Sequence, residues 1–150
     1  MSIRSVSHRF CAIHLQTGLT LSPLIRIGNT PLCASIATYC GTDYENIIVG
    51  NGSTELISLF IQIEHPKKAL VIGPTYSEYE REIALGGGTT LYYPLKEKDD
   101  FRLDVDDFIS HLNENIDLLV VCNPNNPTSS CITQKEYTYI LLINFSRSLA

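Results

Sequence analysis

The chain has 150 residues, 44% of them hydrophobic, and a formal net charge of −5 at pH 7. Its length and composition suffice for one hydrophobic core. The acidic balance disfavours a nucleic-acid or anionic-membrane partner, and no apolar run approaches the roughly 20 residues of a membrane span. The five cysteines form no C-x-x-C pair and the four histidines are scattered. We therefore expect no metal site, and reduced thiols in a cytoplasmic protein.

The first segment, residues 1–28, is expected to be irregular. Residues 1–42 contain no Asp or Glu but carry several Arg, Ser and Thr. Such a composition occurs in transit peptides and, more often, in merely irregular segments, and the sequence leaves both open. The folded part is therefore predicted to be 29–150.

From about residue 29, apolar runs alternate with helical patterns. Strands are predicted over 69–72, 89–95 and 117–122, and the last of these is expected to be buried on both faces. Helices are predicted over 31–39, from about 54 to 63, and over 77–85, 104–113 and 133–145. In the second helix, an apolar stripe is expected at Leu56, Leu59, Phe60 and Ile63. Alternating strands and helices indicate an α/β fold with a mostly parallel sheet flanked by helices.

An Asn- and Pro-dense loop, Cys122-Asn-Pro-Asn-Asn-Pro-Thr128, follows the strand predicted over 117–122. Its prolines restrict the backbone and hold the asparagines in an extended turn. Open α/β sheets bind ligands at the carboxyl ends of their strands, and an amide there can donate to an anionic or phenolic oxygen. The alternative is a plain Pro-rich connection, which is less favoured because three Asn in four positions exceed what a connector needs.

Two further motifs stand where apolar runs end. Gly50-Asn-Gly-Ser-Thr-Glu55 opens a helix, where backbone N–H groups favour a phosphate; an ordinary helix cap fits it equally well. It lacks the glycine pattern of dinucleotide sites and the lysine of P-loops. Pro74-Thr-Tyr-Ser-Glu-Tyr79 places Tyr76 where its ring could stack on a planar ligand, or simply pack a helix against the sheet.

Taken together, these three motifs resemble those of the class I/II (fold-type-I) aminotransferases, which depend on pyridoxal 5′-phosphate (PLP). The similarity covers about residues 29–133 and is greatest to histidinol-phosphate aminotransferase and threonine-phosphate decarboxylase. It implies that 29–150 form the N-terminal part of a large, PLP-binding domain. It further implies that Gly52, Ser53 and Thr54 hold the cofactor phosphate, that Tyr76 stacks on its ring and that Asn126 bonds its phenolic oxygen.

The sequence also departs from the family pattern. The family motif continues Asn-Pro-Thr-Gly, but Ser129 stands at the glycine position, and the Tyr-Pro pair that reaches a partner subunit has no counterpart. The resemblance suggests a homodimer, which the missing pair weakens. It also implies a Schiff-base lysine further along, which these 150 residues do not contain. All five lysines are expected to be solvated, so no catalytic residue is assigned.

Three functions remain open at this stage. The first is a PLP-dependent aminotransferase, truncated before its lysine, that moves an amino group from an amino acid or phosphorylated amine to a 2-oxo acid. The second is a decarboxylase similar to threonine-phosphate decarboxylase. The third is a fragment that binds phosphate or PLP without catalysis. In the first two, the partner is a small-molecule substrate.

Overall fold

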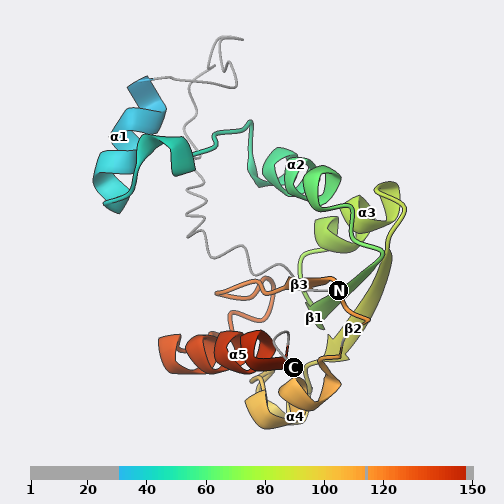
Figure 1. The fold of residues 1–150 in the computed structure, drawn as a ribbon. Helices are drawn as coiled ribbons and strands as arrows, with labels where there is room; N and C mark the ends of the chain where they lie inside the picture. The colour runs from blue at the N-terminus through green and yellow to red at the C-terminus, as the bar shows by residue number, and fades with distance from the viewer. Residues whose placement is uncertain (1–30, 114, 148–150) are drawn as a thin grey trace. The chain divides into compact units, whose positions relative to one another are not determined.

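The computed structural model of this protein describes residues 31–113 and 115–147 (Figure 1). The chain divides into two compact units between Phe60 and Ile61. The segment 1–28, predicted to be irregular, lies outside the described residues. No helix within the described ranges combines the length and the apolar character that a membrane span needs.

The unit that ends at Phe60 contains two short helices and the start of a third. Helix α1 is Pro31–Cys40, the 3-10 helix η1 is Tyr44–Asn46, and α2 is Ser53–Glu64. On α1, the side chains of Cys33 and Ala37 are buried one turn apart. These bounds agree with the helices predicted over 31–39 and 54–63.

The second unit is built on a parallel sheet of three strands in the order β2-β1-β3. The strands are β1 (Lys68–Gly73), β2 (Thr89–Pro94) and β3 (Leu118–Val120). The central strand β1 is buried along almost its whole length, because neighbours pair with it on both sides. The predicted α/β fold with a mostly parallel sheet is confirmed.

Helices connect the strands, as parallel pairing requires. Helix α3 (Glu78–Leu85) leads from β1 to β2, and the 3-10 helix η2 (Glu97–Asp99) and α4 (Val105–His111) lead from β2 to β3. Helix α5 (Gln134–Arg147) follows β3. Alternate residues of β1 point to opposite faces of the sheet. Leu70 and Ile72 join a core cluster with Phe108 of α4 and Ile140 of α5. Figure 1 shows α3 across the sheet from α4.

Local sequence signals explain where these helices begin and end. Asp104 caps α4, since its side chain accepts a hydrogen bond from the backbone N–H of Asp107 at 3.1 Å. Helix α3 ends in a run of three glycines, in which Gly87 has a φ of 81°. A Cβ at Gly88 would lie 2.3 Å from the carbonyl oxygen of Pro66, so only glycine fits there.

Two expectations about burial are wrong. Strand β3 is shorter than 117–122 and only half-buried, because within the described residues it pairs with β1 alone. On α2, Ile63 is 68% exposed, whereas Ile61, outside the predicted stripe, is buried. The helix carries apolar residues on most of its surface, so their spacing did not single out the buried face.

Candidate functional site

Two loops meet at the carboxyl edge of the sheet. Because β1 and β3 are parallel neighbours, the segment after Gly73 and the segment after Val120 leave the sheet on the same side. Tyr76 lies in the first of these loops and Asn126 in the second. The structure therefore brings two of the predicted site residues to one edge of the sheet.

The loop after β3 is closed at its base by a side chain. The amide nitrogen of Asn123 donates to the carbonyl oxygen of Ile132 at 3.0 Å, and the backbone N–H of Ile132 donates to Oδ1 of Asn123 at 2.9 Å. This reciprocal pair copies the two hydrogen bonds that a strand residue would make. Both hydrogen-bonding ends of Asn123 are thus engaged in structure.

Asn125 is buried, with 7% of its surface exposed, and its amide bonds to three groups. Oδ1 accepts from the hydroxyl of Thr75 at 2.7 Å, while Nδ2 donates to the carbonyl of Pro74 at 2.9 Å and to the hydroxyl of Thr128 at 2.7 Å. Its backbone N–H and carbonyl bond to Ser130 and Ser129 across the loop. Both N–H donors of this buried amide are used within the protein, so it has none left to donate to a ligand.

Asn126 differs from both of its neighbours. It is exposed, and its amide makes no hydrogen bond to any other residue of the described chain. Its side chain offers two N–H donors and one carbonyl acceptor at the carboxyl edge of the sheet. Among the three asparagines of this loop, Asn126 alone has an amide with no hydrogen bond to the described residues.

Tyr76 is half-buried and lies against a second tyrosine. Its ring meets that of Tyr79 edge to face, with centroids 5.9 Å apart and an interplanar angle of 88°. Burial, followed by the neighbouring Cys122 thiol, raises the pKa of the Tyr79 phenol above its ordinary value, so this ring stays neutral. The neutral Tyr79 ring supports Tyr76 from one side. Both interpretations of these tyrosines, stacking of Tyr76 on a ligand and packing of the helix against the sheet, stay predictions.

Gly52, Ser53 and Thr54 belong to the unit that ends at Phe60 and are described by themselves. Gly52 has a φ of 90°, a conformation that favours glycine, and Ser53 is the first residue of α2. The carboxylate of Glu55 accepts a hydrogen bond from the backbone N–H of Asn51, as in a helix cap. The segment therefore has the backbone of a helix start, where an anion is favoured. One of its backbone N–H groups, that of Asn51, already donates to the carboxylate of Glu55.

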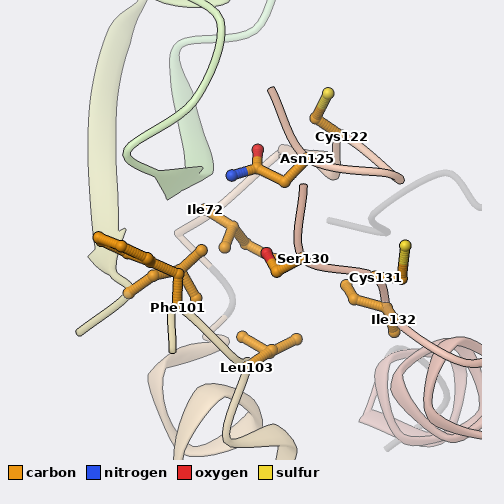
Figure 2. Close-up of a pocket in the computed structure, with 9 residues that line it drawn as sticks. Ile72, Phe101, Leu103, Cys122, Asn125, Ser130, Cys131 and Ile132 are labelled. Carbon is orange, nitrogen blue, oxygen red and sulfur yellow. The ribbon is translucent and has the colours of Figure 1, made fainter. Parts of the chain in front are cut away.

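A small cavity lies beneath the loop that follows β3 (Figure 2). Its volume is about 20 Å³, which holds a single water molecule and no organic ligand. Its lining includes Asn125 and Ser130 and the apolar side chains of Ile72, Phe101 and Leu103. This cavity therefore does not hold an organic ligand of the two loops.

The lysines of the chain lie away from these loops or on the open surface. Lys67 and Lys68 stand at the amino end of β1, on the opposite edge of the sheet from Tyr76. All five lysines, Lys67, Lys68, Lys96, Lys98 and Lys135, are exposed. The solvated state predicted for them is confirmed, and none is buried in a way that would activate its amine.

Sequence reasoning missed the roles of Thr75 and Asn125. Thr75 received no assignment, and Asn125 was grouped with two chemically identical residues. The only sequence signal was their position, since Thr75 directly precedes Tyr76 and Asn125 directly precedes Asn126, the two predicted site residues. The bond between them joins positions 50 residues apart, which local pattern does not reveal.

Comparison with known proteins identifies relatives of most of the chain. The sequence profile of the family "Aminotransferase class I and II" matches residues 16–146. A protein of Caldanaerobacter subterraneus subsp. tengcongensis, named as a candidate threonine-phosphate decarboxylase, is 45% identical over 107 residues, which are 71% of this chain and 29% of that protein. A histidinol-phosphate aminotransferase of Clostridium kluyveri is 35% identical over 117 residues, which are 76% of this chain and 33% of that protein.

A solved structure agrees with these sequence matches. The structure of a decarboxylase from Sulfurospirillum multivorans superposes with a TM-score of 0.68 at 33% identity, covering 75% of this chain and 32% of the other. The chain thus spans about a third of the length of the relatives it matches. The described fold is accordingly part of the large domain of such proteins.

Proposed function

Because the chain belongs to the class I and II aminotransferase family, whose members are PLP-dependent enzymes, we propose that it binds PLP and contributes to amino-group transfer. The observation that carries this proposal is the difference in hydrogen bonding among the three asparagines after β3. Asn123 and Asn125 are occupied by the fold, and Asn126, the position that matches the family motif, is exposed and unbonded to the described residues.

The residues present fit the cofactor by their chemistry. Asn126 would donate its amide N–H to the phenolic oxygen of PLP, and Tyr76 would lie against the face of the pyridine ring. In the other unit, taken by itself, Gly52 gives the tight backbone turn into α2, and the N–H groups of Ser53 and Thr54 have the chemistry to hold a phosphate. Each contact orients the ring or offsets its charge, which is the part of the work that falls to the protein.

When bound, PLP supplies the electron sink that stabilises negative charge at the carbon next to the amino group. The contribution of Asn126 is to hold hydrogen-bond donors at the phenolic oxygen, which stabilises that oxygen as an anion. Tyr76, braced by Tyr79, limits the tilt of the ring and excludes water from one of its faces. The substrate we propose is an amino acid or phosphorylated amine, with a 2-oxo acid as acceptor and a homodimer as the assembly.

The exposed lysines bear on what these 150 residues do alone. None of the five is placed to act as an activated nucleophile, so we expect the chain by itself to bind the cofactor without turnover. A second candidate reaction is decarboxylation of a phosphorylated amino acid. It is favoured by the decarboxylases among the relatives of this chain.

Cofactor binding is tested most cleanly with an analogue that cannot react with lysine. 4′-Deoxypyridoxine 5′-phosphate keeps the ring, the phenolic oxygen and the phosphate but lacks the aldehyde. We expect the full chain to bind it in equilibrium dialysis. Asn126→Ala should weaken binding by about tenfold or more, as loss of a hydrogen bond to a charged group does. Asn115→Ala, which removes another exposed amide, is the matched control and should bind like the wild type. Equal affinity of all three proteins would contradict the proposal.

Catalytic competence is a separate question with a separate measurement. The chain is incubated with PLP itself, reduced with borohydride and mapped by peptide mass spectrometry. Stoichiometric labelling of one lysine would show that these 150 residues supply their own nucleophile. Scattered partial labelling of the exposed lysines, together with tight binding of the analogue, would favour a cofactor-binding fragment.

A further inference from the structure

Side-chain hydrogen bonds connect the two loops at the carboxyl edge of the sheet. The hydroxyl of Thr75 donates to Oδ1 of Asn125 at 2.7 Å, between segments 50 residues apart in sequence. Thr75 immediately precedes Tyr76, and Asn125 immediately precedes Asn126. We propose that Tyr76 and Asn126 contact the ring of PLP. The bond therefore joins the two residues that directly precede them in the chain.

The same amide makes a second bond between the loops and one within its own loop. Nδ2 of Asn125 donates to the carbonyl of Pro74 at 2.9 Å and to the hydroxyl of Thr128 at 2.7 Å. Asn125 is 7% exposed, so water competes poorly for these bonds. An aspartate would keep the shape of this side chain but could not donate to either partner, so the geometry selects an amide.

We propose that Thr75 and Asn125 form an interloop clasp that sets the distance between Tyr76 and Asn126, and that both are positioning residues for cofactor binding. The second half of this inference rests on the proposed function. The clasp acts through the backbone, since each member fixes the residue that follows it. Asn123 serves a different purpose, because it closes the loop after β3 on itself and bonds nothing in the loop after β1.

The clasp can be tested without any ligand, by hydrogen–deuterium exchange of the full chain. Thr75→Val removes the donor while keeping the shape of the side chain. It should accelerate exchange in peptides covering 75–79 and 123–133 together, by about fivefold, as loss of one neutral hydrogen bond would. Thr75→Ser keeps the hydroxyl and should restore slow exchange. Asn123→Ala should accelerate exchange in 123–133 alone. Faster exchange confined to 75–79 in Thr75→Val, or equal effects of valine and serine, would overturn the clasp.

The positioning role is tested by affinity for 4′-deoxypyridoxine 5′-phosphate. Thr75→Val should weaken binding about fivefold in the wild-type background and much less when Asn126→Ala is already present. Asn125→Asp gives a second variant with the same expectation. Equal losses in both backgrounds would show that the clasp does not act through Asn126. If the wild-type chain fails to bind the analogue, the proposed function fails, while the exchange experiment still decides whether the clasp exists.

Discussion

The side chain of Asn123 pairs with the backbone of Ile132 through two hydrogen bonds, of 3.0 and 2.9 Å, in the pattern of neighbouring strand residues. The short strand β3 is thereby followed by a loop whose two ends are held together. Within that frame Asn125 is anchored to the loop after β1, and Asn126 is left exposed. Three identical side chains in four positions thus have three different environments.

Ser129 occupies the left-handed region of backbone conformation, with a φ of 60°. A side chain in this region is disfavoured by roughly 1–2 kcal/mol, and the family motif has glycine here. Ser129→Gly should therefore raise the free energy of unfolding, by about 0.5–1 kcal/mol after the extra freedom of glycine in the unfolded chain is subtracted. Chemical denaturation measures the change.

The neighbouring serine provides the control for that substitution. Ser130 does not have a positive φ, and its hydroxyl lies 2.8 Å from the hydroxyl of Thr128. Ser130→Gly should be destabilising, because it removes this contact and adds freedom to the unfolded chain. If Ser129→Gly destabilised the protein as much as Ser130→Gly, the strain at Ser129 would be disproved.

Thr90 on β2 carries a buried hydroxyl that, within the described residues, has no hydrogen-bond partner. An unsatisfied buried hydroxyl is destabilising by about 1–3 kcal/mol. Thr90→Val replaces it with a methyl group of similar size and should raise the thermal midpoint. Thr89→Val on the same strand, where the side chain is exposed, controls for the strand preference of valine. No gain from Thr90→Val beyond that of Thr89→Val would count against this account.

Tyr93 links the core cluster to α4 through its hydroxyl, which donates to Oδ2 of Asp107 at 2.7 Å. Burial raises the pKa of Tyr93 above its ordinary value of 10.0, and the bond to Asp107 and the nearby acids raise it further. In the unfolded chain the phenol ionises near pH 10, before it does so in the folded protein. Its contribution to stability is therefore complete below pH 10 and is lost as the pH rises above that value.

Replacing this phenol should make the stability less dependent on alkaline pH. Above pH 10, the free energy of unfolding of Tyr93→Phe should fall less steeply than that of the wild type, by at most about 1.4 kcal/mol per pH unit. Some decline should remain, because the pKa values of Tyr79 and Tyr92 are also raised, in each case mainly by burial. Denaturation curves at a series of alkaline pH values measure the slopes. Identical slopes would mean that Tyr93 has the same pKa in the folded protein and in the unfolded chain.

Much of the fold follows from local sequence signals. The β-branched and apolar run of β1, the glycines after Leu85 and the capping Asp104 each determine structure within a few residues of themselves. The proximity of the loops that carry Tyr76 and Asn126 was predictable, because loops that follow neighbouring parallel strands leave the sheet at the same edge. The family signal in those motifs is confirmed by the comparisons.

Other features depend on contacts that are distant in sequence. Asn123 and Asn125 are engaged by Ile132 and Thr75, at separations of 9 and 50 residues, and nothing in the letters of the loop distinguishes them from Asn126. The buried face of α2 was mispredicted for a related reason. The buried side chain of Ile61 lies close to Gly86, since a Cβ built there would be 3.1 Å from its Cγ2, and this contact is distant in sequence.

The central claim is that the amide of Asn126 binds the phenolic oxygen of PLP, and a thermodynamic cycle tests it directly. The affinities of wild type and Asn126→Ala are measured for 4′-deoxypyridoxine 5′-phosphate and for the same molecule without its ring hydroxyl. We predict that loss of the hydroxyl weakens binding to the wild type by about tenfold or more and leaves binding to Asn126→Ala nearly unchanged. An equal loss of affinity in both proteins would show that Asn126 does not contact this oxygen.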